Sequence, residues 1–572
     1  MRVNLISNHR KNTGLSQDVN IMRGLLTSIY EDNKDFEVKL VQYVMPQCSE
    51  ADINIFFEVV NPSLFSYAAK NIWIPNHEWT YKTWVPYLHM MNEIWVKTHE
   101  AERIFSQLTS TRVRYIGWTS LNKEFRSKKN YHKAIVPVGK NIYREVGSIF
   151  VAYDMIQKSN LSQYNRLPFL NIVSRLKIEV PEGISSKVSV VESLSDADYD
   201  ELLSECGVCI CLSRAEGFGH AVNEAMASGC NMIVSSIPPF LEDVIGEANL
   251  GVEFVAADST MENDKCLGKF VLSSIQSLRD ILVEFCDTSF ADRKQGSEFM
   301  RRVYETNHNA WMKRMKEIVP KVFPVTPYSL KHTMPKEEEL PDVSIVCITR
   351  NRRLFMPILK YSYMIQSYPE NKLELIIVDD GDDPIEDTLF GVPNVVYVRL
   401  DQPTSIGEKR NIGISKAMFN VIAFMDDDDV YPNNSVLERV AMMMKFPSKE
   451  CAFCTVIPCY EITKYCSFMN APPIQLPMSQ RVSEATLVFT KKFWEDKKFD
   501  DIQIAEGDTF IHGREHMCRE LSPQEVIVSL VHSKNTSSRK VPEFKEPNGC
   551  HFGFNEKLFA MVSEIGETLK SL

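Results

Sequence analysis

The chain has 572 residues, of which 44% are hydrophobic and 24% are charged, and its formal net charge at pH 7 is −11. These are ordinary values for a globular protein; at roughly 100–200 residues per domain they predict about three to five compact units and exclude global disorder. Because a general nucleic-acid binder carries an excess of basic residues, the negative charge argues against nucleic acid as a partner.

Residues 1–132 predict a doubly wound α/β domain, because short apolar runs alternate with amphipathic stretches. Strands are expected at residues 2–7, 52–57, 72–74 and 93–97, and a helix at 16–29 after a polar loop that contains Gly14. No apolar core of signal-peptide length begins the chain, and no stretch approaches the roughly 18–20 apolar residues needed to span a bilayer. We therefore expect a cytoplasmic protein without a transmembrane segment, whose contact with membranes is peripheral at most.

The same alternation continues over residues 133–322 and predicts a second doubly wound domain. Its expected strands are residues 169–174, 187–191, 208–212 and 231–235. Its expected helices are residues 146–157, 196–204, 219–228, 272–285 and 293–318. Cys206, Cys209 and Cys211 lie in one apolar run, which indicates core packing rather than a disulfide framework.

Residues 323–341 contain four prolines and a charged run, and we interpret them as a linker. A third α/β domain is expected over residues 342–545, with strands at 343–348, 373–378, 395–399 and 421–425, and a tail with a terminal helix over 546–572. Cys451 and Cys454 form a C-x-x-C pair, with Cys459 and Cys466 downstream. Because a zinc site wants two tight pairs and the second is loose, buried strand cysteines are the favoured interpretation.

Three expected strands of the third domain end in polar clusters. The first is followed by TRNR at 349–352, the second by DDGDD at 379–383, and the last by four aspartates at 426–429. In an open parallel sheet, ligands bind beyond the carboxyl ends of the strands. Adjacent carboxylates repel one another unless a cation compensates them, and Mg²⁺ and Mn²⁺ prefer such oxygens while leaving positions open for phosphates. The pattern favours a divalent metal site over its alternative, a solvated acidic turn before a helix near Ser435.

The segments VSIVCITRNR, IIVDDGDD, GEKRNIGISKA and FMDDDD, in this order, resemble the family-two glycosyltransferases of the GT-A fold over about residues 342–540. The resemblance implies a nucleotide-binding role for three residues, Thr349, Asn351 and Asp380. It also implies a basic donor-binding segment made of Lys409, Arg410 and Asn411.

The metal-binding DxD motif of that family matches the aspartate run. Asp426 and Asp428 are the favoured ligands of Mn²⁺ or Mg²⁺, and Asp427 is assigned to the donor. The run contains two overlapping registers, and the sequence alone does not choose between them.

Enzymes of this family invert the anomeric centre by direct displacement, so the resemblance also implies a carboxylate that deprotonates the acceptor hydroxyl. The segment AEGDTF offers Asp508 as the candidate base and Glu506 as the second choice, a surface turn being the alternative. His532 resembles a late metal-ligand histidine, although a lone histidine after an apolar strand is often structural. Arg539 is a further candidate contact for the diphosphate.

The segment SRAEGFGHAVNEAMASG at 213–229 carries the chemistry of the N-terminal half. Gly217 and Gly219 allow close approach of the backbone to a ligand, and a helix that starts near Gly219 and stops at Gly229 points free N–H groups at this loop. Such a helix start suits a diphosphate. Glu216 and Glu224 can both face the hydroxyls of a sugar nucleotide.

This segment resembles the E-x7-E motif of family-four glycosyltransferases, which have the GT-B fold, retain the anomeric configuration and need no metal. The resemblance covers about residues 1–320 and is specific only at 216–229. It implies that Glu216 contacts the donor sugar, that Glu224 contacts the ribose and that Gly14 belongs to a glycine loop at the donor cleft.

The cation pair of that family is altered here. Lys140 and Arg144 follow Gly139 at a shortened spacing, which puts donor affinity in doubt. On the acceptor side, the segment IPNHEW offers His77 and Glu78, for which ordinary loop polarity is the alternative.

The leading hypothesis is a bifunctional glycosyltransferase that transfers sugars from nucleotide-sugar donors to a growing glycan, glycoprotein or glycolipid. Its C-terminal domain is expected to be inverting and metal-dependent, and its N-terminal half retaining and cofactor-free. The alternative is that only the C-terminal domain is catalytic and the N-terminal half holds the acceptor or a glycan. A sugar-nucleotide synthesising enzyme is disfavoured because ITRNRRLF lacks the glycine-rich loop that such enzymes want.

Overall fold

The computed structural model describes residues 1–8, 14–45, 48–192, 194–323, 335–445, 447–523, 525–535 and 553–571. The chain divides into two compact units. Unit 1 comprises Met1–Tyr43, Ala51–Val60 and Lys70–Pro327, and unit 2 comprises Val44–Glu50, Asn61–Ala69 and Tyr328–Leu572. No helix in the described part of the chain is both long and apolar enough to cross a membrane.

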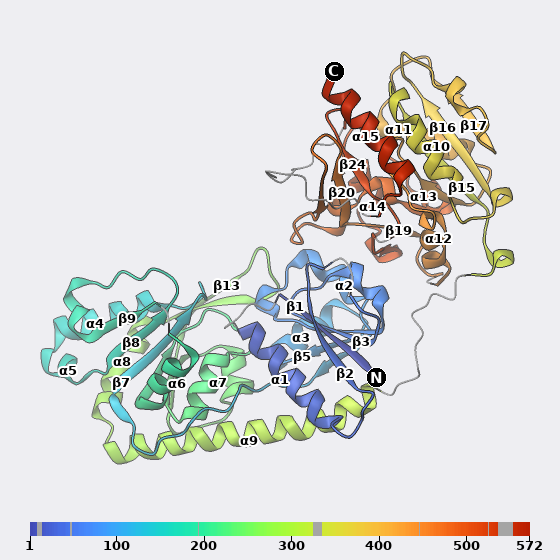
Figure 1. Cartoon of the computed structure of the whole chain (residues 1–572). Coiled ribbons are helices and arrows are strands. Elements are labelled where there is room, and N and C mark those ends of the chain that lie inside the picture. Colours follow the sequence, from blue (N-terminus) through green and yellow to red (C-terminus); the bar gives the residue numbers. More distant parts are fainter. Residues whose placement is uncertain are drawn as a thin grey trace. The chain divides into compact units, whose positions relative to one another are not determined.

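The first sheet of unit 1 has the order β2-β1-β3-β4-β5-β6, with β1 parallel to both of its neighbours (Figure 1). The strands are β1 (Arg2–Ser7), β2 (Glu37–Gln42), β3 (Ala51–Phe57), β4 (Ala68–Ile74), β5 (Glu93–Val96) and β6 (Val113–Tyr115). The helices are α1 (Gly14–Ile29), α2 (Val85–Leu88) and α3 (His99–Leu108). Leu5 and Ile55 of the central strands are fully buried in the core that also contains Met22 and Leu26 of α1.

The second sheet of unit 1 has the order β12-β11-β10-β7-β8-β9, and all of its neighbouring strands are parallel. The strands are β7 (Asn130–Gly139), β8 (Phe169–Ser174), β9 (Val188–Val191), β10 (Cys206–Cys211), β11 (Asn231–Ser235) and β12 (Val252–Val255). The helices are α4 (Val146–Ser159), α5 (Leu161–Arg166), α6 (Asp196–Glu205), α7 (His220–Ser228) and α8 (Ile275–Asp287).

The helix expected at 272–285 starts later than predicted, because its first residues belong to an antiparallel hairpin of β13 (Ala257–Glu262) and β14 (Lys269–Ser273). Ser274 then caps α8 by accepting the Ser277 backbone N–H at 3.4 Å.

The long helix α9 (Phe290–Val322) ties the two domains of unit 1 together. It begins beside the second sheet and runs along the unit to the first (Figure 1). Along the way the Tyr304 hydroxyl donates to the Ser120 carbonyl at 3.0 Å, and the Trp311 and Trp118 rings meet edge to face. The two doubly wound domains of unit 1 therefore share one packed core.

Unit 2 is built on a seven-stranded sheet with the order β17-β16-β15-β18-β22-β19-β23. The strands are β15 (Val343–Thr349), β16 (Leu373–Asp379), β17 (Val395–Arg399), β18 (Val421–Phe424), β19 (Cys451–Phe453), β22 (Val488–Thr490) and β23 (Cys518–Glu520). The first four in sheet order are parallel, and β22 runs antiparallel to both of its neighbours. A smaller sheet has the order β21 (Cys466–Asn470), β20 (Ile457–Glu461) and β24 (Ser529–Val531).

The helices of unit 2 are α10 (Met356–Met364), α11 (Ile406–Lys416), α12 (Ser435–Lys445), α13 (Lys491–Asp496), α14 (Glu506–Ile511) and α15 (Glu556–Ser571). The expected fold class is confirmed: two parallel, doubly wound domains of GT-B type precede an α/β domain of GT-A type. The described cysteines are free thiols, and all of them except Cys48 are buried, as their apolar surroundings predicted.

Candidate active sites

A cavity of about 630 Å³ lies at the carboxyl ends of β15 and β18 in unit 2. Because these strands are parallel neighbours, the loops that follow them open at the same edge of the sheet. The cavity is lined from five segments, which are residues 348–352, Asp426 to Asp429, the first turns of α11, residues 483–485 and residues 503–506, together with Ser529, Lys534 and Asn535.

The part of the cavity near Thr349 is organised around a buried ion pair. Lys409 Nζ lies 2.8 Å from Asp380 Oδ1 and 3.4 Å from the Thr349 carbonyl oxygen. The other Asp380 oxygen accepts the Thr404 backbone N–H at 2.8 Å. Asn351 has a positive φ of 55° and accepts the Asp382 N–H at 2.7 Å, so it shapes the loop after β15. The structure thus brings together the residues that the sequence assigned to the nucleotide.

Asn411 lies apart from these residues. Its side-chain carbonyl oxygen accepts the Trp494 indole N–H at 2.9 Å, and its side-chain amide donates to the Phe499 carbonyl at 2.9 Å. These bonds hold α13 and the chain after it against α11. Neither Asn411 nor Asp380 is among the residues that line the cavity, whereas Lys409, the ion-pair partner of Asp380, is.

The four aspartates after β18 have different partners. Asp427 is buried and accepts the Thr349 hydroxyl at 2.5 Å, and burial together with the charge of Asp428 raises its pKa to about 8. Asp429 accepts the Ser529 hydroxyl at 2.7 Å and the Leu530 N–H at 2.9 Å, which ties the run to β24. Asp426 and Asp428, the two favoured metal ligands, reach different parts of the cavity.

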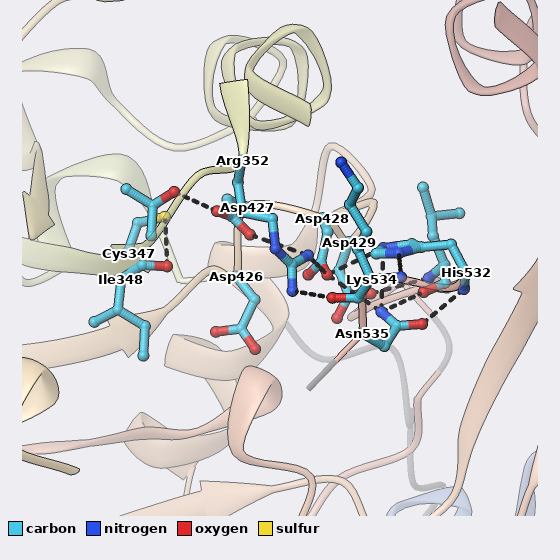
Figure 2. A network of polar contacts seen from close by, with 12 residues as sticks. Cys347, Ile348, Arg352, Asp426, Asp427, Asp428, Asp429, His532, Lys534 and Asn535 are labelled. Atoms are coloured by element: carbon cyan, nitrogen blue, oxygen red, sulfur yellow. Dashed lines mark hydrogen bonds and ion pairs between the residues drawn. The ribbon is translucent and has the colours of Figure 1, made fainter. Parts of the chain in front are cut away.

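Asp428 forms a polar cluster with three residues (Figure 2). Its carboxylate is ion-paired with Arg352, and its Oδ2 lies 3.1 Å from His532 Nε2 and 3.2 Å from Asn535 Nδ2. Burial opposes ionisation of Asp428, but the His532 hydrogen bond and the Arg352 charge lower its pKa to about 2. Figure 2 shows the Asp426 carboxylate apart from this cluster.

The predicted metal ligands Asp426, Asp428 and His532 fit a hard or borderline divalent cation in part. Asp428 and His532 offer an oxygen and a nitrogen 3.1 Å apart, close enough to share one ion. A positive charge already compensates Asp428, because the Arg352 guanidinium lies on it. Over the described residues, the group of three potential ligands within 4.8 Å of one another is His99, Glu242 and Asp243 in unit 1, so the three predicted ligands of unit 2 are not gathered as tightly.

The opposite wall of the cavity carries two glutamates around a buried arginine. Arg410 Nε donates to Glu506 at 2.9 Å, Arg410 Nη2 lies 3.5 Å from Asp426, and the guanidinium stacks on Phe424 at 4.3 Å. The carboxylates raise the pKa of Arg410 above its ordinary value although burial opposes the charge. Glu484, which the sequence did not single out, lines the same wall.

Asp508 is half-buried on α14, two residues after Glu506, and does not line the cavity. At 100° per residue, side chains two positions apart on a helix point in nearly opposite directions. Arg539 lies outside the described residues.

In unit 1 the two glutamates of the E-x7-E segment are both held by polar partners. Glu216 Oε1 lies 2.6 Å from Arg144 Nη2 and accepts the Ser213 hydroxyl at 2.7 Å. Glu224 Oε1 accepts the Gln17 amide at 2.6 Å and lies 3.4 Å from Lys123 Nζ. Gln17 belongs to α1 of the first domain, so the contact with Glu224 crosses between the two domains of unit 1.

The helix α7 begins as expected at the glycine loop. Gly219 is its N-cap with φ 97°, a conformation that favours glycine, and a side chain there would also collide with Phe240. Gly14 begins α1 and lies opposite His220, since a Cβ on Gly14 would be 3.6 Å from that imidazole ring. Gly14 at the start of α1 and the glycine loop at the start of α7 are therefore adjacent, as the resemblance implied.

A buried carboxylate lies beside this helix start. Asp18 Oδ1 lies 2.8 Å from His220 Nε2, and Asp18 Oδ2 lies 2.5 Å from Lys97 Nζ. His220 Nδ1 is in turn 2.8 Å from the Ser120 hydroxyl. The first residue of α7 therefore already faces a negative charge.

The remaining candidates of unit 1 differ in exposure. Lys140 is exposed, whereas the guanidinium of Arg144 is buried and ion-paired with Glu216. Glu78 is buried against the glycine loop, since a Cβ on Gly217 would lie 2.8 Å from its Oε1, and burial raises its pKa to about 7. Burial opposes protonation of His77, but Glu100 at 3.2 Å and the charge of Glu78 raise its pKa.

Two family models match this chain, one in each unit. The family model "Glycosyl transferase family 2" matches residues 344–494, which contain the strand ends and the aspartate run. The family model "Glycosyl transferases group 1" matches residues 181–265, which contain the E-x7-E segment. The chain carries domains of two glycosyltransferase families. We refer to them below as the family 2 domain in unit 2 and the group 1 domain in unit 1.

Curated relatives match over short stretches. A GDP-mannose:cellobiosyl-diphosphopolyprenol alpha-mannosyltransferase of Xanthomonas oryzae pv. oryzae is 37% identical over 83 residues, which is 14% of this chain and 22% of that protein. The enzyme of the same name from Komagataeibacter xylinus is 43% identical over 58 residues, 10% of this chain and 15% of that protein. The chain thus spans about a fifth or less of the length of these relatives.

Solved structures align with parts of this chain. A mannosyltransferase from Pyrobaculum calidifontis, solved with GDP-Man and Mn²⁺, has a TM-score of 0.28 and 15% identity over 35% of this chain and 59% of that chain. The structure of TarM has a TM-score of 0.36 and 13% identity over 53% of this chain and 58% of that chain.

Proposed function

We propose that this chain is a bifunctional glycosyltransferase in which each half transfers a sugar from a nucleotide-sugar donor to a glycan, glycoprotein or glycolipid acceptor. The observation that carries the proposal is that three surfaces line one cavity of the family 2 domain: the surface formed by Thr349 and Lys409, the aspartate run at 426–429, and the surface formed by Glu484 and Glu506. A nucleotide, a metal-bound diphosphate and an acceptor hydroxyl need these three kinds of surface side by side.

In the family 2 domain, Asp380 and Lys409 bind the nucleotide, and Asp426, Asp428 and His532 would hold Mn²⁺ or Mg²⁺. When bound, such an ion neutralises the diphosphate that leaves the sugar. The acceptor hydroxyl enters from the side of Glu506 and Glu484, and a carboxylate removes its proton as the acceptor oxygen attacks the anomeric carbon. Because attack occurs opposite the leaving group, the anomeric configuration inverts. Asp508 and Glu506 are the two bases that the sequence assigned.

In the group 1 domain, the α7 start binds the diphosphate, Glu216 the sugar and Glu224 the ribose, without a metal. Arg144 and Lys140 supply the positive charge, and transfer retains the anomeric configuration.

A binding module is the second candidate function for the group 1 domain. Two observations favour it. The Glu224 carboxylate is already bound by Gln17 and Lys123, and Asp18 is already paired with His220, the first residue of α7. In that case unit 1 holds the acceptor or a glycan while the family 2 domain performs the transfer.

The deciding experiment measures release of nucleoside diphosphate from a panel of sugar nucleotides by the full chain, with Mn²⁺ and with EDTA. Asp426→Asn with Asp428→Asn should remove the EDTA-sensitive release, and Glu216→Gln with Glu224→Gln should remove the EDTA-insensitive release. Full release in EDTA by the Glu216/Glu224 variant would refute metal dependence of the family 2 domain. Absence of any EDTA-insensitive release would favour the binding module.

A further inference from the structure

Glu484 lies on a loop that is fixed beside the aspartate run. The Tyr431 hydroxyl accepts the Asp426 backbone N–H at 2.8 Å and donates to the Ala485 carbonyl at 3.0 Å. On either side of Glu484, the Ser483 N–H donates to Cys454 O at 2.9 Å, and the Thr486 hydroxyl donates to Ser483 O at 2.7 Å. The loop therefore holds Glu484 at a defined place in the cavity wall.

The carboxylate of Glu484 lies against the first turn of α14. Its Oε1 accepts the Gly507 backbone N–H at 3.3 Å. A Cβ on Gly507 would stand 2.8 Å from that oxygen, so the approach requires glycine at this position. The contact places Glu484 next to Glu506, and both residues line the cavity.

The two neighbouring glutamates have unequal partners. Glu506 accepts a charge-assisted hydrogen bond from Arg410 at 2.9 Å, which engages one of its carboxylate oxygens. Over the described residues, Glu484 makes no ion pair, and apart from its own backbone N–H its carboxylate accepts only the Gly507 N–H, at 3.3 Å. A carboxylate with so few partners keeps its lone pairs available for a proton.

The charged groups that face Glu484 are Glu506 and Arg410. Burial and the negative charge of Glu506 raise the pKa of Glu484 to about 7, and the more distant charge of Arg410 opposes this only in part. A general base works best when its pKa is near the working pH, because it is then both deprotonated and strongly basic.

We infer that Glu484 is the catalytic base of the family 2 domain and that Glu506 and Arg410 are its positioning residues. The inference rests on the proposed function of this domain. In the step, the acceptor oxygen forms a bond to the anomeric carbon and its proton passes to a Glu484 oxygen. The bond from that carbon to the diphosphate oxygen breaks, and its electron pair leaves on the diphosphate.

The test uses the full chain with Glu216→Gln and Glu224→Gln throughout, so that the group 1 domain contributes nothing. GDP-mannose and UDP-GlcNAc serve as donors and water as the acceptor, with Mn²⁺ present. We expect Glu484→Gln to lower kcat by about 10²- to 10⁴-fold while the affinity for GDP or UDP changes less than about threefold. The low-pH limb of kcat, centred near pH 7 in the parent, should disappear.

Two further variants separate a missing base from a damaged fold. Glu484→Ala should regain turnover in added formate, because formate can occupy the space and accept the proton. The matched control Glu495→Gln changes an exposed glutamate on α13 and should leave kcat unchanged. Rescue by formate together with normal nucleotide binding would support the inference.

Several results would overturn it. Near-parent turnover in Glu484→Gln would overturn the inference. A low-pH limb of kcat that persists in Glu484→Gln but disappears in Asp508→Asn or Glu506→Gln would overturn it as well. Loss of nucleotide binding in both Glu484→Gln and Glu484→Asp would reassign Glu484 to the donor site. A parent that binds no nucleoside diphosphate and hydrolyses neither donor would refute the proposed function and the inference with it.

Discussion

His532 Nε2 lies 3.1 Å from Asp428 Oδ2, although 104 positions separate the two residues in the sequence. The imidazole also stacks on Phe355 with ring centroids 4.4 Å apart, so its orientation is fixed by packing as well as by the carboxylate. A rigid oxygen–nitrogen pair of this kind is suited to one divalent ion.

From this pair we expect His532→Ala to weaken the Mn²⁺-dependent binding of GDP or UDP at least tenfold, since one metal ligand is lost. Calorimetric titration of nucleoside diphosphate with and without Mn²⁺ measures the effect. His512→Ala, at a side chain that is 76% exposed, is the matched control. Equal Mn²⁺ dependence in the His532 variant and the parent would argue that the histidine is structural.

Arg410 is expected to contribute strongly to the stability of unit 2. Its removal in Arg410→Met leaves the buried Glu506 and the neighbouring Asp426 without their cation, which costs about 3–5 kcal/mol in the free energy of unfolding. Urea unfolding followed by tryptophan fluorescence measures this loss. Arg353→Met removes an exposed ion pair with Asp383 and should have a much smaller effect, because solvent screens that pair. Equal shifts for the two variants would contradict the assignment.

The stability of unit 1 should depend on pH through Asp18. Burial opposes the ionised form, but Lys97 and His220 lower the pKa of Asp18 below its ordinary value of 3.8. A carboxyl whose pKa is lower in the folded state stabilises the fold above the unfolded pKa and loses this contribution as pH falls through the folded one. Asp18→Asn should therefore cost about 3–5 kcal/mol at pH 7, by leaving Lys97 unpaired, and progressively less below about pH 4.

Urea unfolding of the parent and Asp18→Asn between pH 7 and pH 3 measures the difference in the free energy of unfolding. Asp32→Asn, at an exposed position in the same domain, controls for the loss of one negative charge. A difference that stays constant over this pH range would show that the Asp18 charge does not contribute.

Donor binding by the group 1 domain should depend on Glu224. We expect Glu224→Ala to weaken nucleotide binding by about 1.5–3 kcal/mol, or roughly ten- to a hundredfold, because the ribose loses a charged acceptor. Glu216→Ala should impair sugar transfer more than binding of the bare nucleoside diphosphate. EDTA should change neither result, and Glu247→Ala, an exposed glutamate of the same domain, is the control.

Calorimetry of the full chain carrying Asp426→Asn and Asp428→Asn, against nucleoside diphosphates and sugar nucleotides, isolates this domain. If no nucleotide binds at millimolar concentration, the group 1 domain is better described as a module that holds the acceptor.

Much of the fold could be predicted because hydrophobic patterns are local. The strands β1, β8, β11 and β17 have the bounds expected from their apolar runs, and the carboxyl ends of β15 and β18 meet as parallel neighbours should. Several strands were not expected from the sequence, among them β2, β6 and β7. β2 is an edge strand with no buried side chain, β6 has only three residues, and Pro137 interrupts the apolar run of β7.

The chemical classes of the candidate sites can be read from local sequence: an aspartate run after a buried strand, a glycine-bearing helix start, and basic residues ahead of both. It could not distinguish four identical aspartates, because the distinction lies in partners that are distant in sequence. Thr349 binds Asp427, Ser529 binds Asp429, and His532 approaches Asp428. These partners depend on the folded arrangement of the chain, as do the contact of Gln17 with Glu224 and that of Glu484 with the first turn of α14. Hydrogen bonds and ion pairs act over about 3–4 Å in space whatever the separation along the chain, and so they leave no periodic trace in the sequence.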